Sequence, residues 1–120
     1  IIYSGKLSKD VNFDYIFNIS EDGWFGSSIG PKQHFSHSVF RSIESGKYVV
    51  RAANNGISAI INPIGFVEQE VEFGSVGYVE LTSSKLIKPT PFMLFGNKIF
   101  LMLILLYIFL IFSFNKLRNE

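Results

Sequence analysis

The residues best suited to acid–base or metal chemistry lie between Glu21 and His37. This segment holds two adjacent acids, Glu21 and Asp22, and two histidines, His34 and His37. Carboxylates and imidazoles are the usual groups of general acid–base catalysis. Adjacent acids beside a glycine are more often solvated residues of a turn, and that interpretation is favoured here. A catalytic role for the two acids therefore remains the second hypothesis.

The two histidines have the spacing of a possible metal site, because residues three apart on a helix share a face. A structural or catalytic zinc needs at least one more protein ligand. The chain contains no third histidine and no cysteine, so we expect no metal and no cofactor. His34 is instead expected to act through hydrogen bonds near the loop that carries Trp24.

Trp24, Phe25 and Gly26 place two large aromatic side chains on a loop directly after an apolar segment. Clefts for ligands often form at the ends of strands in layered α/β folds. One interpretation is an aromatic wall for an apolar substrate such as an acyl chain. The other is a loop that packs its aromatic rings against the core, and the residue types alone favour this second interpretation.

The elements that would position these residues begin with a strand over residues 14–20, DYIFNIS. This nearly continuous apolar run is typical of a central strand covered on both faces. A helix is predicted from Gly30-Pro31, since proline is favoured in the first helical turn, to the stop at Gly46. Its core-facing stripe would contain Phe35, Val39 and Ile43, with Phe40 beside them. Arg41 and Glu44 would pair at the surface.

The rest of the domain reads as strands separated by turns. Val67, Val71 and Phe73 are expected on one face of their strand, opposite three glutamates. Arg51 lies inside an apolar strand and must find a partner or reach solvent. The order β, α, β, β, β, β fits a layered α/β (α+β) domain over residues 1–82. The predicted strands are residues 48–53, 57–62, 66–73 and 76–81, with turns at 54–56, 63–65 and 74–75.

An apolar segment, residues 99–114, follows a connector over residues 83–98 and precedes a tail over 115–120. As a helix, the segment would be about 24 Å long. Because the hydrocarbon core is about 30 Å thick, the segment spans it once Lys98 and Lys116 extend toward the surface. The alternative is a helix buried in a soluble core. The lysines on both sides leave the topology open.

Composition excludes several functions. The net charge is +1 and no basic stripe carries interleaved aromatics, so nucleic acid is not an expected partner. The chain has no glycine-rich phosphate loop and no nucleophile elbow. It opens on Ile1-Ile2-Tyr3, three strand-forming residues without an initiator methionine. We therefore expect a piece of a longer protein that starts inside or just after a strand.

The segment from Asn18 to Gly65 closely resembles the apolipoprotein N-acyltransferases, the membrane branch of the carbon-nitrogen hydrolase (nitrilase) superfamily. The family pattern is similar to N-I-S-N-D-x-W-F-G-x-S-x-G-P-x-Q-H and then R-A-x-x-x-G-R-P-x-x-R-A-x-N-x-G-x-S-A. This chain departs from the pattern at Glu21, Ser27, Lys47 and Tyr48. The matching positions are Trp24, Phe25, Gly26, Ser28, Gly30, Pro31, Gln33, His34, Arg41, Glu44, Gly46, Arg51, Ala52, Asn54 and Gly56.

The resemblance implies the C-terminal part of an αββα sandwich followed by one transmembrane helix. Such enzymes use a Glu-Lys-Cys triad to move an acyl chain from a phospholipid, through a thioester, to the N-terminal amine of a diacylglyceryl-cysteine. The triad residues would lie upstream, so no catalytic residue is assigned in this chain and the chain alone is expected to be inactive. Trp24, Phe25 and His34 are the predicted substrate-binding residues.

The implied partners are a phospholipid donor, an apolipoprotein acceptor and the lipid bilayer. The implied location is the bacterial inner membrane, with the nitrilase-like domain in the periplasm and the tail in the cytoplasm. Two alternatives stay open. One is a membrane-anchored amidohydrolase of the same superfamily, and the other is a non-enzymatic, tail-anchored domain.

Overall fold

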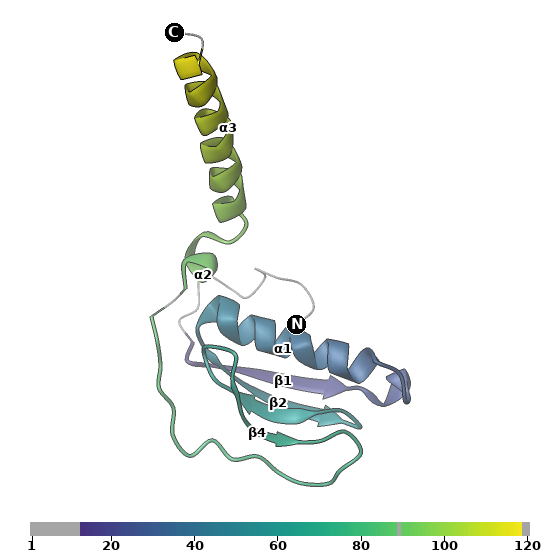
Figure 1. The fold of residues 1–120 in the computed structure, drawn as a ribbon. Coiled ribbons are helices and arrows are strands. Elements are labelled where there is room, and N and C mark those ends of the chain that lie inside the picture. The colour runs from purple at the N-terminus through teal and green to yellow at the C-terminus, as the bar shows by residue number, and fades with distance from the viewer. Residues whose placement is uncertain (1–12, 89, 119–120) are drawn as a thin grey trace.

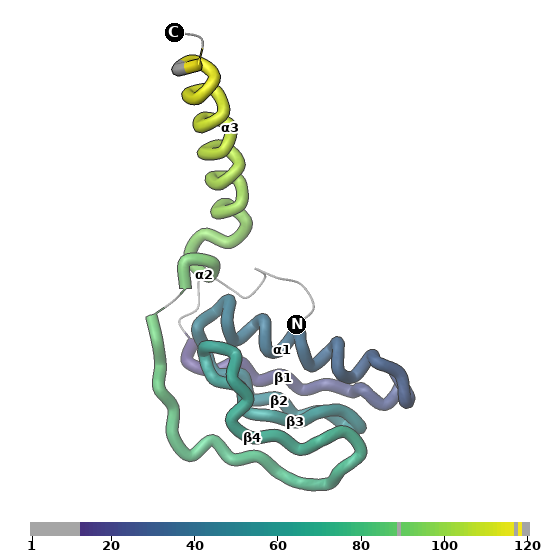
Figure 2. The backbone as a smooth tube through the Cα atoms, viewed as in Figure 1, coloured from purple at the N-terminus to yellow at the C-terminus, as the bar shows by residue number. Residues whose placement is uncertain are grey.

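The computed structural model describes residues 13–88 and 90–118. It consists of a small α/β domain from which one long helix projects (Figure 1; Figure 2). Along the chain the elements are β1 (Tyr15–Glu21), the 3-10 turn η1 (Gly23–Phe25), α1 (Gly30–Ser45), β2 (Tyr48–Asn54), β3 (Ser58–Ile61), β4 (Val67–Val71), α2 (Pro91–Phe95) and α3 (Lys98–Arg118). The predicted layered α/β class is confirmed.

The domain is a four-stranded sheet in the order β1-β2-β3-β4, covered on one face by α1 (Figure 1). β1 and β2 are parallel, with Asn18 beside Arg51, and the later pairs are antiparallel. α1 makes the crossover that a parallel pair requires. The apolar core lies under this helix and consists of Ile16, Val49, Ala59 and Ile61. Because β1 and β2 run in the same direction, their carboxyl ends meet at one edge of the sheet.

α1 has the predicted ends, but its buried face is more polar than predicted. It starts at Gly30-Pro31, and Gly46 caps it in the left-handed region with φ 65°. Phe35 and Val39 pack against the core, as expected. Phe40 and Ile43, in contrast, are 55% and 44% exposed, which corrects the predicted stripe. The reason is that serines and Arg41 occupy much of the face toward the sheet: Ser38, Arg41, Ser42 and Ser45 are buried.

The predicted pair of Arg41 and Glu44 forms, with 2.7 Å between Nη1 and Oε2. Its location differs from the prediction, because Arg41 is buried rather than on the surface. Burial raises the pKa of the Glu44 carboxyl, and the charge and hydrogen bond of Arg41 only partly oppose this effect.

β1 was predicted as a central strand covered on both faces, and the structure corrects this. Within the described residues β1 is an edge strand. Ile16 faces α1 and is buried, whereas Phe17 and Ile19 point to the other face and are 72% and 88% exposed. Successive side chains of a strand alternate between faces, and α1 covers only one of them. The strand-forming residues Ile1-Ile2-Tyr3 lie outside the described residues.

β4 contains an irregularity that places its valines on opposite faces. Val67 pairs with Ile61, but Gln69 rather than Glu68 pairs with Ile60. Glu68 is therefore the extra residue of a β-bulge. The bulge shifts the register by one and reverses which side chains face the core. Val71 consequently pairs with Ser58. The prediction that Val67 and Val71 share a face is therefore wrong.

The predicted last strand, residues 76–81, is irregular instead. Val76 and Tyr78 are exposed, and Val79 and Leu81 are only half-buried, so little burial favours a strand here. Hydrogen bonds from the Gln69 side chain, rather than backbone pairing with a strand, hold this segment. The Gln69 amide donates to the Glu80 carbonyl at 2.9 Å and accepts from its N–H at 3.0 Å.

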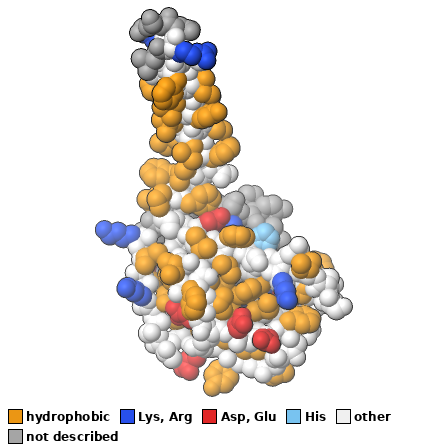
Figure 3. Space-filling view, viewed as in Figure 1, with side chains coloured by type: hydrophobic (Ala, Val, Ile, Leu, Met, Phe, Trp, Pro, Cys, Tyr) orange, Lys and Arg blue, Asp and Glu red, His pale blue; other side chains and the backbone are white. Residues whose placement is uncertain are grey.

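α3 is longer than the predicted 99–114 helix, because it continues as far as Arg118. Residues 98–116 have a mean hydropathy of 2.3, and none of that span is buried against the other described residues. By length and composition this helix can cross a membrane. Apolar side chains cover its visible face, and basic residues lie near its end (Figure 3). Within the predicted connector, residues 91–95 form the short helix α2.

Candidate functional site

β1, β2 and α1 enclose a group of polar side chains toward the carboxyl ends of the two strands, called here the polar cluster. Both parallel strands end at this edge of the sheet, and the chain leaves β1 through η1 to reach α1. Edges of this kind are common ligand sites in α/β folds. The members of the polar cluster are Asn18, Ser20, Asp22, His34, Ser38 and Arg51.

Arg51 is at the centre of the polar cluster and has no exposed surface. Its Nη2 donates to Asp22 Oδ2 at 2.7 Å, and its Nε donates to the Ile57 carbonyl at 3.1 Å. Its Nη1 donates to Ser38 Oγ at 3.2 Å and also to the Asn18 side chain. A buried guanidinium must be paired and hydrogen-bonded, so the prediction that Arg51 finds a partner is confirmed.

Asp22 is completely buried, which corrects its interpretation as a solvated turn residue. Its Oδ1 accepts from Ser20 Oγ at 2.6 Å and lies 2.8 Å from His34 Nδ1. Burial alone would raise the pKa of Asp22. The hydrogen bonds from Ser20 and His34, together with the Arg51 charge, outweigh burial and hold this pKa below its ordinary value. Asp22 is therefore an anion at neutral pH.

The Asp22 carboxylate determines which ring nitrogen of His34 carries a proton. An ionised carboxylate only accepts hydrogen bonds, so His34 Nδ1 is the donor in this contact. In the neutral ring, Nε2 is then left as an acceptor. The His34 side chain is only 18% exposed. The contact with Asp22 thus fixes the orientation of the ring and places Nε2 away from the carboxylate.

Glu21, the other acid of the pair, stabilises the loop around this site. Its Oε1 accepts from the Gly23 N–H at 2.8 Å, and its Oε2 accepts from the Asn54 amide at 2.6 Å. Asn55 adopts φ 51° in the predicted turn. Gly56 lies directly against Asp22, because an added Cβ would approach Asp22 Oδ2 to 2.3 Å. The two hydrogen bonds of Glu21 give it a structural role in this loop, in agreement with its interpretation as a turn residue.

The structure brings Phe25 and His34 together, with their ring centroids 5.9 Å apart in an edge-to-face arrangement. Trp24 contacts Phe25 at 5.5 Å between centroids. Phe25 is half-buried, but Trp24 is 82% exposed. The indole therefore does not pack into the core, which contradicts the second interpretation for Trp24. The half-buried Phe25 thus lies between the exposed Trp24 and the His34 imidazole.

A shallow hollow of about 190 Å³, called here the His34 hollow, opens beside these rings. Its lining residues are Phe25, Gly30, Gln33, His34 and His37. His37 lines the same hollow but belongs to no group that could hold a metal: among residues 13–88 and 90–118, no three acidic, histidine or cysteine side chains cluster in that way. The chemistry available here is hydrogen bonding and apolar contact.

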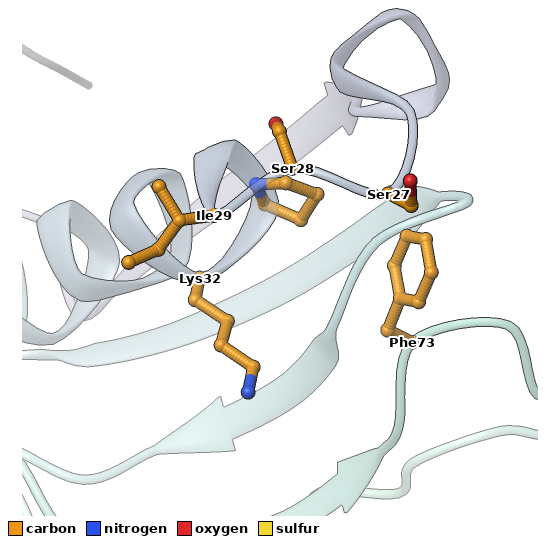
Figure 4. A pocket seen from close by; sticks show the side chains of 6 residues that line it. Ser27, Ser28, Ile29, Lys32 and Phe73 are labelled. Carbon is orange, nitrogen blue, oxygen red and sulfur yellow. The ribbon is translucent and has the colours of Figure 1, made fainter.

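A second hollow, of about 390 Å³, lies beside the first turn of α1 (Figure 4). Phe73, which follows β4, points toward Ser27, and the Lys32 side chain extends from α1 on the same side. None of the three predicted site residues lines this hollow. Its lining residues are Ser27, Ser28, Ile29, Pro31, Lys32 and Phe73.

Sequence reasoning singled out Phe25, His34 and Arg51 but missed how the acids and serines connect them. One signal was available. A guanidinium in an apolar strand requires an anion, and Asp22 follows the neighbouring strand. Ser38 carried no signal, because it is thirteen positions from Arg51 in the sequence and contacts it only in the fold.

Comparison with known proteins agrees with this architecture. The profile of the carbon-nitrogen hydrolase family matches residues 8–87. An apolipoprotein N-acyltransferase of Rickettsia bellii is 46% identical over 108 residues, which cover 89% of this chain and 21% of the relative. The enzymes of that name from Rickettsia prowazekii and Wigglesworthia glossinidia brevipalpis are 40% identical over 108 residues (89% and 22%) and 42% identical over 100 residues (81% and 20%). The chain thus spans about a fifth of the length of these curated relatives.

Proposed function

The chain belongs to the carbon-nitrogen hydrolase family, and on that premise we propose that it is part of an N-acyltransferase that acylates apolipoproteins. One observation carries the proposal: an apolar helix without buried surface follows the family domain after α2. A donor acyl chain resides in a bilayer, so an enzyme that uses it must reach the bilayer. The names of the similar proteins support the same reaction.

The proposed reaction has two steps. A cysteine thiolate of the full-length protein attacks the acyl ester of a phospholipid, forming a thioester and releasing the lysophospholipid. The free amine of a diacylglyceryl-cysteine then attacks the thioester, which forms an amide and returns the thiol. The chain contains no cysteine, so the nucleophile is supplied by another part of the protein and these 120 residues are inactive alone.

The described residues contribute to binding in this proposal. Trp24 and Phe25 provide apolar surface for the acyl chain where the loop meets the His34 hollow. His34 Nε2 accepts a hydrogen bond from an N–H or O–H group of a substrate. Asp22 acts as a positioning residue, because it holds Nδ1 protonated without touching the substrate. No step requires a cofactor or a metal.

The partners in the proposal are the phospholipid donor, the apolipoprotein acceptor and the bilayer that α3 enters. The location is the bacterial inner membrane, with the α/β domain in the periplasm and the end of α3 in the cytoplasm. α3 supports the membrane location by its length and its apolar surface. Basic residues lie on both sides of it, so the proposed orientation rests on the family resemblance and not on charge.

The second candidate is hydrolysis of a carbon–nitrogen bond by a membrane-anchored amidohydrolase, which the family name favours. The two reactions differ in the acceptor, which is an amine in one and water in the other. The purified full-length protein should be incubated in phospholipid vesicles with a diacylglyceryl-cysteine peptide. Transfer predicts a peptide heavier by one acyl chain. Ammonia release from amides without acylated peptide would overturn the acyltransferase proposal in favour of the hydrolase.

A further inference from the structure

The hydroxyl of Thr90 joins the end of α1 to the start of α2. Thr90 Oγ1 donates a hydrogen bond to the main-chain carbonyl of Glu44, in the last turn of α1. The same oxygen accepts from the Met93 N–H at 3.2 Å and so caps α2. A carbonyl in the last helical turn has no partner within its own helix, so this bond satisfies an otherwise open acceptor.

Gly46 allows the chain that leads into α2 to lie directly against the end of α1. The glycine is buried, and its φ of 65° favours a residue without a side chain. An added Cβ would lie 3.2 Å from the Lys88 carbonyl, and 3.3 Å from both Ile87 Cγ1 and Thr90 Cγ2. The contact between the two helices is therefore built from the main chain as well as from the Thr90 side chain.

Only Gly96 and Asn97 separate α2 from α3. The Gly96 N–H donates to the Phe92 carbonyl at 2.7 Å, and the Ile99 N–H donates to the Gly96 carbonyl at 3.2 Å. α2 contacts both α1 and α3, and it lies between them in the ribbon (Figure 1). The apolar helix is thus connected to α1 by a short hydrogen-bonded path.

α1 carries the His34 hollow at its other end. The sixteen residues of this helix span about 24 Å, and a helix of that length behaves as a stiff element. α1 runs across the direction of α3 in the ribbon (Figure 1), so holding one end of α1 against α2 fixes where the hollow at the other end lies relative to α3. Among residues 13–88 and 90–118, loss of the contact would leave α3 attached through the irregular chain that follows β4 (Figure 2).

We propose that Thr90 is a positioning residue, whose hydroxyl holds α2 against α1 and thereby holds the His34 hollow in a fixed orientation relative to α3 and the bilayer that α3 enters. This inference rests on the proposed function. Thr90 touches no substrate. Its effect is on access to a donor that is embedded in a membrane, and it has no effect on a donor that diffuses freely.

Three substitutions separate the two roles of the hydroxyl. Thr90→Ser keeps the donor to Glu44 and the cap of α2. Thr90→Asp keeps a good capping acceptor but has no proton to donate to the carbonyl. Thr90→Val keeps the shape and removes both bonds. Each variant is made in the full-length protein, and acyl transfer is measured with phospholipid in vesicles and with short-chain phospholipid below its micellar concentration.

With vesicles, we expect Thr90→Val and Thr90→Asp to lower the rate roughly two- to tenfold, the range set by the loss of one hydrogen bond. Thr90→Ser should match the wild type, and all four proteins should be equal with the dispersed donor. Normal rates for Thr90→Asp in vesicles would show that the hydroxyl only caps α2 and would overturn the proposal. Equal losses with both donors would also overturn it.

Hydrogen–deuterium exchange separates this inference from the proposed function. In nanodiscs, peptides covering residues 40–47 and 87–95 should exchange faster in Thr90→Val and Thr90→Asp than in Thr90→Ser. This result does not depend on turnover. A wild type without transferase activity would refute the proposed function, whereas unchanged exchange in Thr90→Asp would refute the positioning role of Thr90.

Discussion

Arg51 and Asp22 form an ion pair with 2.7 Å between Nη2 and Oδ2, and neither side chain has exposed surface. The pair joins the middle of β2 to the residue that follows β1. Through its second oxygen Asp22 also contacts His34 of α1. One carboxylate therefore connects two strands and the helix at the edge where the candidate site lies.

Asp22→Asn should strongly destabilise the domain. The substitution conserves shape but leaves the buried guanidinium of Arg51 without a counter-charge, which costs about 3–5 kcal/mol. Thermal unfolding of the full-length protein measures the effect. Glu21→Gln, an exposed neighbour, is the matched control and should cost far less. A loss in Asp22→Asn no larger than in this control would show that the ion pair does not stabilise the fold.

Acidification should remove the same contribution. The folded-state pKa of Asp22 lies below its ordinary value, so the carboxylate stabilises the fold above the unfolded pKa of about 3.9 and this contribution is lost as pH falls through the lower, folded value. The difference in unfolding temperature between the wild type and Asp22→Asn should thus be largest near neutral pH and shrink below pH about 4. A constant difference down to low pH would contradict this assignment.

His34→Asn tests the imidazole as a binding group. The Asn amide nitrogen can take the place of Nδ1 and donate to Asp22, but nothing replaces Nε2. We expect unfolding to be nearly unchanged and the acyl-transfer rate to fall roughly tenfold, as for the loss of a hydrogen bond to substrate. His37→Asn, which alters the same hollow without breaking a bond to Asp22, is the control. Turnover unaffected by His34→Asn would remove His34 from the site.

Trp24→Ala should slow acyl transfer and leave the protein folded. The indole is 82% exposed, so its removal creates no cavity, while apolar surface for an acyl chain is lost. The effect should be seen mainly in KM for the phospholipid donor. Tyr78→Ala, at an aromatic that is 86% exposed in the segment after β4, should change nothing. Equal kinetics for the two variants would show that Trp24 does not contact the donor.

Local chemistry made part of the fold predictable. Gly30-Pro31 and Gly46 mark the ends of α1 because proline and glycine act within a single helical turn. The unpaired cation in a strand predicted a partner for Arg51. Features that depend on what covers a surface were not predictable. The apolar run of β1 and the apolar residues of the predicted strand at 76–81 both indicate burial, but Ile19 and Tyr78 are exposed in the described structure.

The bulge in β4 shows the same limit at a smaller scale. The alternation of valines and glutamates predicted one apolar face, and the single skipped residue Glu68 reverses it. Nothing in the local sequence indicates that a β-bulge forms there. In the site, the position of His34 near the loop that carries Trp24 and Phe25 was predicted. The burial of Asp22 was not, because it depends on Arg51, which is twenty-nine positions away.

The central claim is that this domain belongs to an enzyme that carries an acyl chain on a thiol before passing it to an amine. Intact mass spectrometry of the full-length protein, after incubation with phospholipid alone, tests that claim most directly. We predict a mass gain of one acyl group, which disappears when a diacylglyceryl-cysteine peptide is added and reappears on that peptide. A protein that stays unmodified, or an acyl adduct that is passed only to water in the presence of the peptide, would contradict the claim.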